Sequence, residues 1–130
     1  MPSVKDLINS IKELDKYMVI SPEREREIYQ CLGTFLLMKG YKVLYEGKPV
    51  DFIVKVGDTE IPIEVKLNPT VGGMEDAINN LFEDMKENNW DKGILLVVDT
   101  KSEHKAFTEA EKKGVVEKYK KKIYVVGVKI

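Results

Sequence analysis

Residues 51–67 read DFIVKVGDTEIPIEVKL, and this segment predicts a β-hairpin around which the other elements can be arranged. Residues 51–56 and 60–67 alternate between the two faces expected of a pleated strand. Gly57-Asp58-Thr59 between them has the composition of a tight turn. We therefore expect two antiparallel strands joined by a short loop.

The second strand of this hairpin carries charged side chains on one face. Because side chains alternate along a strand, Glu64 and Lys66 should point to one side and Ile63 and Val65 to the other. Asp51 begins the first strand and should converge on Glu64 and Lys66. Buried without partners, these charges would be costly, and a divalent cation between the carboxylates would offset that cost. The alternative is a half-solvated hairpin with its charges outward.

The composition limits the classes of protein to which this chain can belong. Its 130 residues suffice for one domain with a hydrophobic core, and a high Lys and Glu content is typical of thermophiles. A formal net charge of −1 means that any contact with nucleic acid must come from a local basic patch. The single cysteine, Cys31, excludes an internal disulfide and a cysteine-cluster zinc site. The single histidine, His104, argues against a histidine-based triad or metal site.

The chain shows no signal peptide and no apolar run of the length that crosses a membrane. We therefore expect a cytoplasmic protein without a membrane partner. No internal repeat or low-complexity linker divides the sequence.

A first amphipathic helix is predicted near the N-terminus. Ser3 and Asp6 have the spacing of a capping box, and apolar residues then recur at helical spacing as far as Met18. This helix is expected to cover a flank of the domain. The alternative is a surface that forms a dimer.

Ser21-Pro22 predicts the start of a second helix, which Gly40 ends. Glu25 falls on the apolar stripe of this helix and is the acid expected to face inward, with Glu27 in reserve. The alternative is that these are ordinary first-turn acids, which favour the positive end of the helix dipole.

The remaining elements follow from the same periodicities. They are a short strand at 41–45, a turn at 46–49, a flexible connection at 68–73, a helix at 74–88, a strand at 94–98, a helix opened by Thr100 and Glu103, and a strand at 123–128. The apolar run at 94–98 indicates a strand covered on both faces. This order predicts an α/β fold with a mixed central sheet flanked by helices.

Asp51 followed by Glu64-Val65-Lys66 resembles the signature of the PD-(D/E)XK nuclease superfamily. The resemblance covers residues 21–98, which would form the restriction-endonuclease-like αβββαβ core. Residues 1–20 would be an N-terminal helical addition, and residues 99–130 a C-terminal helix and strand of the same single domain. Glu25 matches the acid that this family often carries on its first core helix. Within this superfamily, the spacing of these motif residues most resembles that of archaeal Holliday-junction resolvases and small restriction-type enzymes.

This resemblance implies an endonuclease that uses Mg²⁺ or Mn²⁺ to hydrolyse DNA phosphodiester bonds. Asp51, Glu64 and the backbone carbonyl of Val65 would bind the metal, and Glu25 would act directly, through water or at a second metal. Lys66 would position and help deprotonate the attacking water, and its alternative is a simple ion pair. A homodimer is expected, because one site per chain requires two copies to cut both strands.

Further residues are candidates for contact with nucleic acid. They are Lys48, Asn68 and Thr70 near the hairpin, and Lys120, Lys121 and Lys122 in a basic run with interleaved tyrosines. The alternative for each is an ordinary solvated surface residue.

Two features depart from the family pattern. Pro62 lies inside the motif strand and removes one ladder donor, which requires a bulge or an open side of the strand. The resolvases are usually basic, whereas this chain has a net charge of −1. Its charge therefore does not favour structured or junction DNA over other DNA as the substrate. Two other functions therefore compete with the nuclease: a catalytically silent nucleic-acid-binding or assembly module, and an interaction domain in which the motif is a coincidence.

Overall fold

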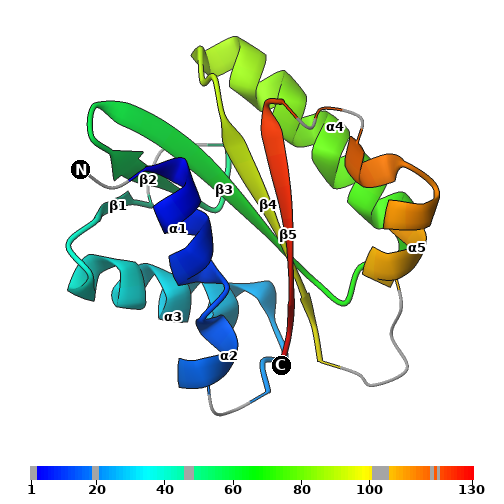
Figure 1. Ribbon diagram of the computed structural model, residues 1–130, viewed down its shortest axis with the longest axis horizontal. Helices are drawn as coiled ribbons and strands as arrows, with labels where there is room; N and C mark the ends of the chain where they lie inside the picture. Colours follow the sequence, from blue (N-terminus) through cyan, green and yellow to red (C-terminus); the bar gives the residue numbers. More distant parts are fainter. Residues whose placement is uncertain (1–2, 19–20, 46–48, 101–105, 118, 120) are drawn as a thin grey trace.

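The computed structural model of the protein describes residues 3–18, 21–45, 49–100, 106–117, 119 and 121–130. Its strands are β1 (Lys42–Leu44), β2 (Phe52–Val56), β3 (Thr59–Leu67), β4 (Gly93–Asp99) and β5 (Ile123–Lys129). They form one five-stranded sheet in the order β1-β2-β3-β4-β5 (Figure 1). β1, β2 and β3 are antiparallel neighbours, whereas β3, β4 and β5 run parallel. The predicted hairpin and mixed sheet are both present.

Helices cover both faces of this sheet (Figure 1). They are α1 (Val4–Ile11), α2 (Leu14–Tyr17), α3 (Glu25–Met38), α4 (Val71–Asn88) and α5 (Ala106–Lys112), with a 3₁₀ turn, η1 (Val115–Glu117), before β5. The predicted first helix is therefore two short ones. Its capping box is confirmed, because Ser3 Oγ accepts from the Asp6 N–H at 3.2 Å and Asp6 Oδ2 accepts from the Ser3 N–H at 2.8 Å.

Alternation along the strands divides the core into two layers. Phe52, Ile63 and Val65 pack toward α1, α2 and α3, while Ile53 and Leu95 pack toward α4. Every residue of β4 is buried, which confirms the prediction of a strand covered on both faces. Glu64 and Lys66 interrupt this apolar pattern on the face that α4 covers.

Two predicted boundaries are wrong. α3 begins at Glu25 and not at Ser21-Pro22, because Arg24 is still extended and Pro22 is buried, so the proline packs before the helix starts. Gly72-Gly73 is not a flexible connection but lies in the first turn of α4, where Thr70 Oγ1 accepts from the Gly73 N–H at 2.9 Å.

Other boundaries follow the sequence. Gly40 ends α3 with a φ of +96°, a value at which glycine carries no steric penalty. Gly114 has a φ of +74° and separates α5 from η1, so the helix does not resume after it. The capping start predicted at Thr100-x-x-Glu103 extends outside the described residues.

Pro62 is accommodated without a bulge. The β2–β3 register passes through Ile53 opposite Pro62 unbroken, and pairing with β4 begins one residue later, at Ile63 opposite Ile94. The missing N–H therefore faces the β4 side just before that ladder starts. Within the described ranges, no helix combines the length and apolar character needed to cross a membrane.

Candidate active site

β3 continues beyond the point where its neighbour β2 begins. Phe52, the first residue of β2, pairs with Ile63, while β3 runs on to Leu67. The N–H and C=O groups of alternate residues point to the same side of a strand, so those of Val65 and Leu67 face the side where β2 is missing. These backbone groups are part-buried and need partners from elsewhere.

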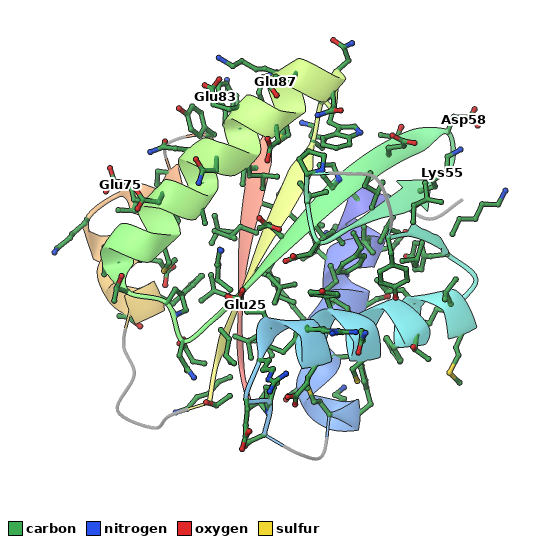
Figure 2. All side chains as sticks on the ribbon, turned by 180° about the vertical axis from the view of Figure 1, so that it is seen from behind. Glu25, Lys55, Asp58, Glu75, Glu83 and Glu87 are labelled. Atoms are coloured by element: carbon green, nitrogen blue, oxygen red, sulfur yellow. The ribbon has the colours of Figure 1, made fainter. Side chains whose placement is uncertain are left out.

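Carboxylate side chains supply those partners. Asp51 Oδ2 accepts from the Val65 N–H at 2.7 Å, and Glu25 Oε2 accepts from the Leu67 N–H at 3.1 Å. The N–H of Asp51 in turn donates to Glu64 Oε1 at 3.0 Å. Figure 2 shows Glu25 at the start of α3, where it reaches the sheet. Three acids from α3, the approach to β2 and the end of β3 thus lie along one strand edge.

Asp51 and Glu64 form a coupled pair of acids. Burial raises the pKa of Glu64, and the charge of Asp51 and a hydrogen bond shared with its carboxylate raise it further, to about 8. The N–H of Asp51 and the charge of Lys66 act in the opposite direction on this pKa. Glu64 therefore holds a proton at neutral pH when no other positive charge stands between the two groups.

Lys66 is half-buried on the same face as Glu64, two residues further along β3. Its charge reaches Glu64, as the effect on the pKa shows. Ion pairs formed among the described residues join Lys39 to Glu13, Lys86 to Glu83 and Lys122 to Asp91, and none of these uses Lys66. The alternative of a simple structural ion pair thus has no direct contact to support it.

The donor set at this edge suits a hard divalent cation. Asp51, Glu64 and the Val65 carbonyl, which faces the same opening as its N–H, offer only oxygen, the donor that Mg²⁺ prefers. Glu25 is bound two residues further along the strand, roughly 7 Å away. In the described part of the chain, no three acidic, histidine or cysteine side chains gather closely enough to hold an ion. A role of Glu25 through water or at a second ion stays a prediction, and Glu27 is exposed.

Asn68 and Thr70, both predicted to contact phosphate, have structural partners. The side-chain amide of Asn68 donates to Thr100 Oγ1 at 2.8 Å and accepts from the Thr100 N–H at 2.9 Å, which joins the ends of β3 and β4. Asn68 also has a φ of +47°. Thr70 is the N-cap of α4.

The predicted lysine contacts are not brought to the acids where the structure describes them. Lys48 and Lys120 lie outside the described residues. The backbone carbonyl of Lys122 accepts from the Gly93 N–H at the start of β4, and Lys122 Nζ lies 3.7 Å from Asp91 Oδ1. Lys121 is the preceding residue and lies at the same end of β4. Lys66, by contrast, pairs with Val97 toward the other end of β4.

Sequence reasoning missed the backbone role of these acids. The sequence contained a sign of this role. The predicted second strand, 60–67, is longer than the first, 51–56, so it must extend beyond the first at one end and leave backbone groups there without a strand partner. Sequence reasoning also missed Tyr29, which lies one helical turn after Glu25 on α3.

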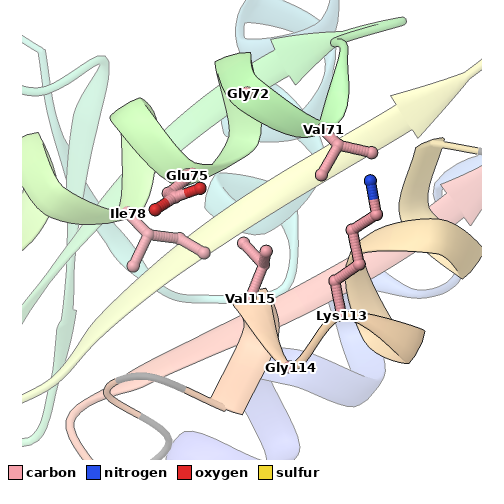
Figure 3. Close-up of a pocket in the computed structure, with 7 residues that line it drawn as sticks. All are labelled: Val71, Gly72, Glu75, Ile78, Lys113, Gly114 and Val115. Atoms are coloured by element: carbon pink, nitrogen blue, oxygen red, sulfur yellow. The ribbon is translucent and has the colours of Figure 1, made fainter.

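A separate pocket of about 620 Å³ lies between the start of α4 and the segment around Gly114 (Figure 3). Glu75 and Lys113 are its charged lining residues. No residue of the predicted site lines it, so we assign it no part in the chemistry of the acids.

No protein-family model matches the sequence, and the searches of curated proteins and of solved structures likewise gave no match.

Proposed function

We propose that this protein is a metal-dependent nuclease that hydrolyses phosphodiester bonds of DNA with Mg²⁺ or Mn²⁺. The observation that carries the proposal is the coupled pair of Asp51 and Glu64 beside an open strand edge, with Lys66 on the same face. The order α3, β1, β2, β3, α4, β4 also follows the αβββαβ order of the restriction-endonuclease-like core. An acid with a raised pKa, as Glu64 has, beside a basic neighbour is typical of catalytic sites.

The residues of this edge have distinct roles in the proposal. Asp51 and Glu64 hold the cation together with the Val65 carbonyl, and Glu25 contributes through water or at a second cation. A bound Mg²⁺ ion supplies charge for the phosphoryl oxygens and acidifies a water ligand. Lys66 orients the attacking water and offsets the negative charge that develops on the phosphate.

The surface charge of α4 disfavours the approach of DNA along that helix. α4 covers the face to which Glu64 and Lys66 point, and it carries five acids, of which Glu75, Glu83 and Glu87 point outward in Figure 2, against the single lysine Lys86. A polyanion is repelled from that helix. Beside Glu25, in contrast, α3 carries the exposed Arg26. For a duplex substrate, a homodimer remains part of the proposal.

A second function is favoured by one specific observation. Asp51 and Glu25 each accept a backbone N–H of β3, which is a sufficient structural reason for both acids. A catalytically silent module that binds nucleic acid or another protein would keep these contacts without turnover.

Two measurements separate these functions. Calorimetric titration with Mn²⁺ should show binding that Asp51→Asn removes, and the absence of any divalent-cation binding would contradict the nuclease. Incubation with Mg²⁺ and a panel of single-stranded, duplex, flapped and four-way DNAs should give products that EDTA abolishes. Metal binding without product from any DNA would favour the silent module.

A further inference from the structure

A hollow of about 660 Å³ lies on the outer side of α3. It is lined by Arg26, Tyr29, Gln30 and Thr34 of α3, and by Tyr45, which follows β1. Its lining thus combines two aromatic rings with a guanidinium, an amide and a hydroxyl. A volume of this size is within the range of pockets that hold small ligands or a single nucleotide.

Two residues at or next to this hollow, Arg26 and Phe52, are sequence neighbours of the candidate acids Glu25 and Asp51. Arg26 follows Glu25 on α3. On the sheet, the rings of Tyr29 and Tyr45 lie with their centroids 6.4 and 6.0 Å from that of Phe52, and Phe52 follows Asp51. Phe52 and Asp51 point to opposite faces of the sheet at the end where β2 begins, so a strand of nucleic acid that passes round this end with a phosphate at the acids would bring a neighbouring nucleotide toward the hollow.

The lining has the chemistry that holds an unpaired nucleobase. Tyrosine rings stack on the face of any base, and an arginine binds the adjoining phosphate. The Tyr45 side chain is accessible, with 38% of the residue exposed, and Arg26 is exposed beside it. In a duplex the base faces are occupied by their neighbours, so such a ring recognises a strand whose bases are free.

We propose that this hollow binds an unpaired base of a single DNA strand, and that it directs that strand across the acids at the end of β3. This inference rests on the proposed nuclease function and narrows its substrate to single-stranded segments, whether free or at a flap. A nuclease that takes one strand at a time needs only one site, so cleavage would not require a second copy of the chain.

Gly33 offers a way to disturb the hollow without changing a residue that lines it. A Cβ at position 33 would overlap the hydroxyl end of Tyr45, which lies over this glycine. In Gly33→Ala the tyrosine ring must move, while alanine suits the helix better than glycine. Gly72→Ala is the matched control, because a Cβ at Gly72 in α4 meets nothing within 4 Å.

The test measures the binding of a fluorescent oligothymidylate of about 12 nucleotides by anisotropy in EDTA, so that no cleavage intervenes. Tyr45→Leu should weaken binding about 5- to 100-fold, as expected for the loss of one stacked base, and Tyr45→Phe should stay within about twofold. Gly33→Ala should weaken binding in the same direction, and Gly72→Ala should not. Arg26→Gln should reduce the salt dependence by about 0.7 of a logarithmic unit, the contribution of one phosphate on a single strand.

Several outcomes would overturn this inference. They are unchanged affinity in Tyr45→Leu and Gly33→Ala, no binding of the oligonucleotide by the wild-type protein, or equal competition by a duplex of the same sequence. The failure of the nuclease itself would look different. In that case tyrosine-dependent binding persists in EDTA, but no DNA is cut when Mg²⁺ or Mn²⁺ is added.

Discussion

Between Thr59 and Ile63, β3 is paired residue by residue with β2, whereas from Val65 to Leu67 the same side of the strand faces carboxylates. The first half obtains its backbone partners from another backbone, and its buried Ile61 and Ile63 serve the core. The second half obtains them from Asp51 and Glu25. One strand thus contains a segment whose backbone groups are paired with another strand and a segment whose backbone groups are paired with charged side chains.

This difference shows how a structural and a catalytic role can share the same atoms. An ionised carboxylate has two oxygens and about four acceptor positions, so a single backbone hydrogen bond leaves most of its capacity open. Asp51 accepts from the Val65 N–H with Oδ2 and shares a hydrogen bond with Glu64, and a cation that displaces the Glu64 proton would find acceptor positions of Asp51 open. The backbone contact also fixes the carboxylate in place, which is what a preorganised ligand requires.

The largest expected effect comes from removing charge in the second half of this comparison. Asp51→Asn should abolish metal-dependent cleavage, with a loss above about 100-fold, since a direct ligand matters more than the groups that orient it. Without metal, its stability above about pH 8, where Glu64 is ionised, should stay level or rise, because the amide relieves repulsion with Glu64. Cleavage and urea unfolding, both measured on purified protein, check these outcomes.

The matched control is Asp58→Asn, the same substitution at an exposed residue in the turn between β2 and β3. It should leave cleavage unchanged. If Asp51→Asn unfolds, its carboxylate is required for folding. If it cuts DNA at the normal rate, Asp51 has no part in the mechanism.

Lys66→Ala should separate binding from chemistry. Single-turnover cleavage is expected to fall about 100-fold, while affinity for Mn²⁺ stays level or tightens slightly because a repelling charge is gone. Lys55→Ala, at another half-buried lysine of the hairpin, serves as the control. A lower DNA affinity with a shallower salt dependence would instead make Lys66 a phosphate anchor. Unchanged single-turnover cleavage would exclude its catalytic role.

The coupled acids should also make stability depend on pH. The pKa of Glu64 is raised to about 8, so the folded protein binds this proton more tightly than the unfolded chain. In EDTA, stability should therefore fall as pH rises from about 4.5 toward 8, by about 2 kcal/mol once solvent screening of a partly exposed group is included. Glu64→Gln should lack this decrease. If the stability of the wild type and of Glu64→Gln changed by the same amount between pH 5 and pH 9, the raised pKa of Glu64 would be contradicted.

The smallest effect tests the junction that ends this strand segment. Asn68→Gly loses the two hydrogen bonds to Thr100 but suits the positive φ, so it should cost about 1 kcal/mol. Asn68→Ala adds strain in the left-handed region and should cost about 2 kcal/mol. Asn89→Gly, also at a positive φ but at the exposed end of α4, should be neutral or stabilising. Thermal unfolding measures all three, and equal stability of Asn68→Gly and wild type would remove the junction's contribution.

The hairpin and the placement of its charges could be predicted because strand alternation is a local property. Two-residue periodicity alone puts Glu64 and Lys66 on one face, and the position of the turn at Gly57 sets the register that brings Asp51 near Glu64. For the same reason, the buried run of β4 was recognisable from its composition.

The misplaced boundaries depend on contacts that are distant in sequence. Ser21-Pro22 has the local chemistry of a helix start, but burial of Pro22 and the reach of Glu25 to Leu67 place the start of α3 later. Gly72-Gly73 has the composition of a loop, yet capping by Thr70 makes it part of a helix. Likewise, the hollow is lined by Tyr29 of α3 and by Tyr45, which follows β1. No sequence spacing reveals that these two residues line the same hollow.

The amides of Val65 and Leu67 give the candidate site two built-in spectroscopic probes. A hydrogen bond to an ionised carboxylate shifts an amide proton resonance, and the shift changes when that carboxylate takes up a proton or shares its charge. The Val65 signal reports on Asp51 and its partner, whereas the Leu67 signal reports on Glu25 alone. When Mn²⁺-free protein is titrated with Mg²⁺ and followed by nuclear magnetic resonance, the order in which the two amide signals shift would show whether Glu25 responds to the same binding event as Asp51 and Glu64.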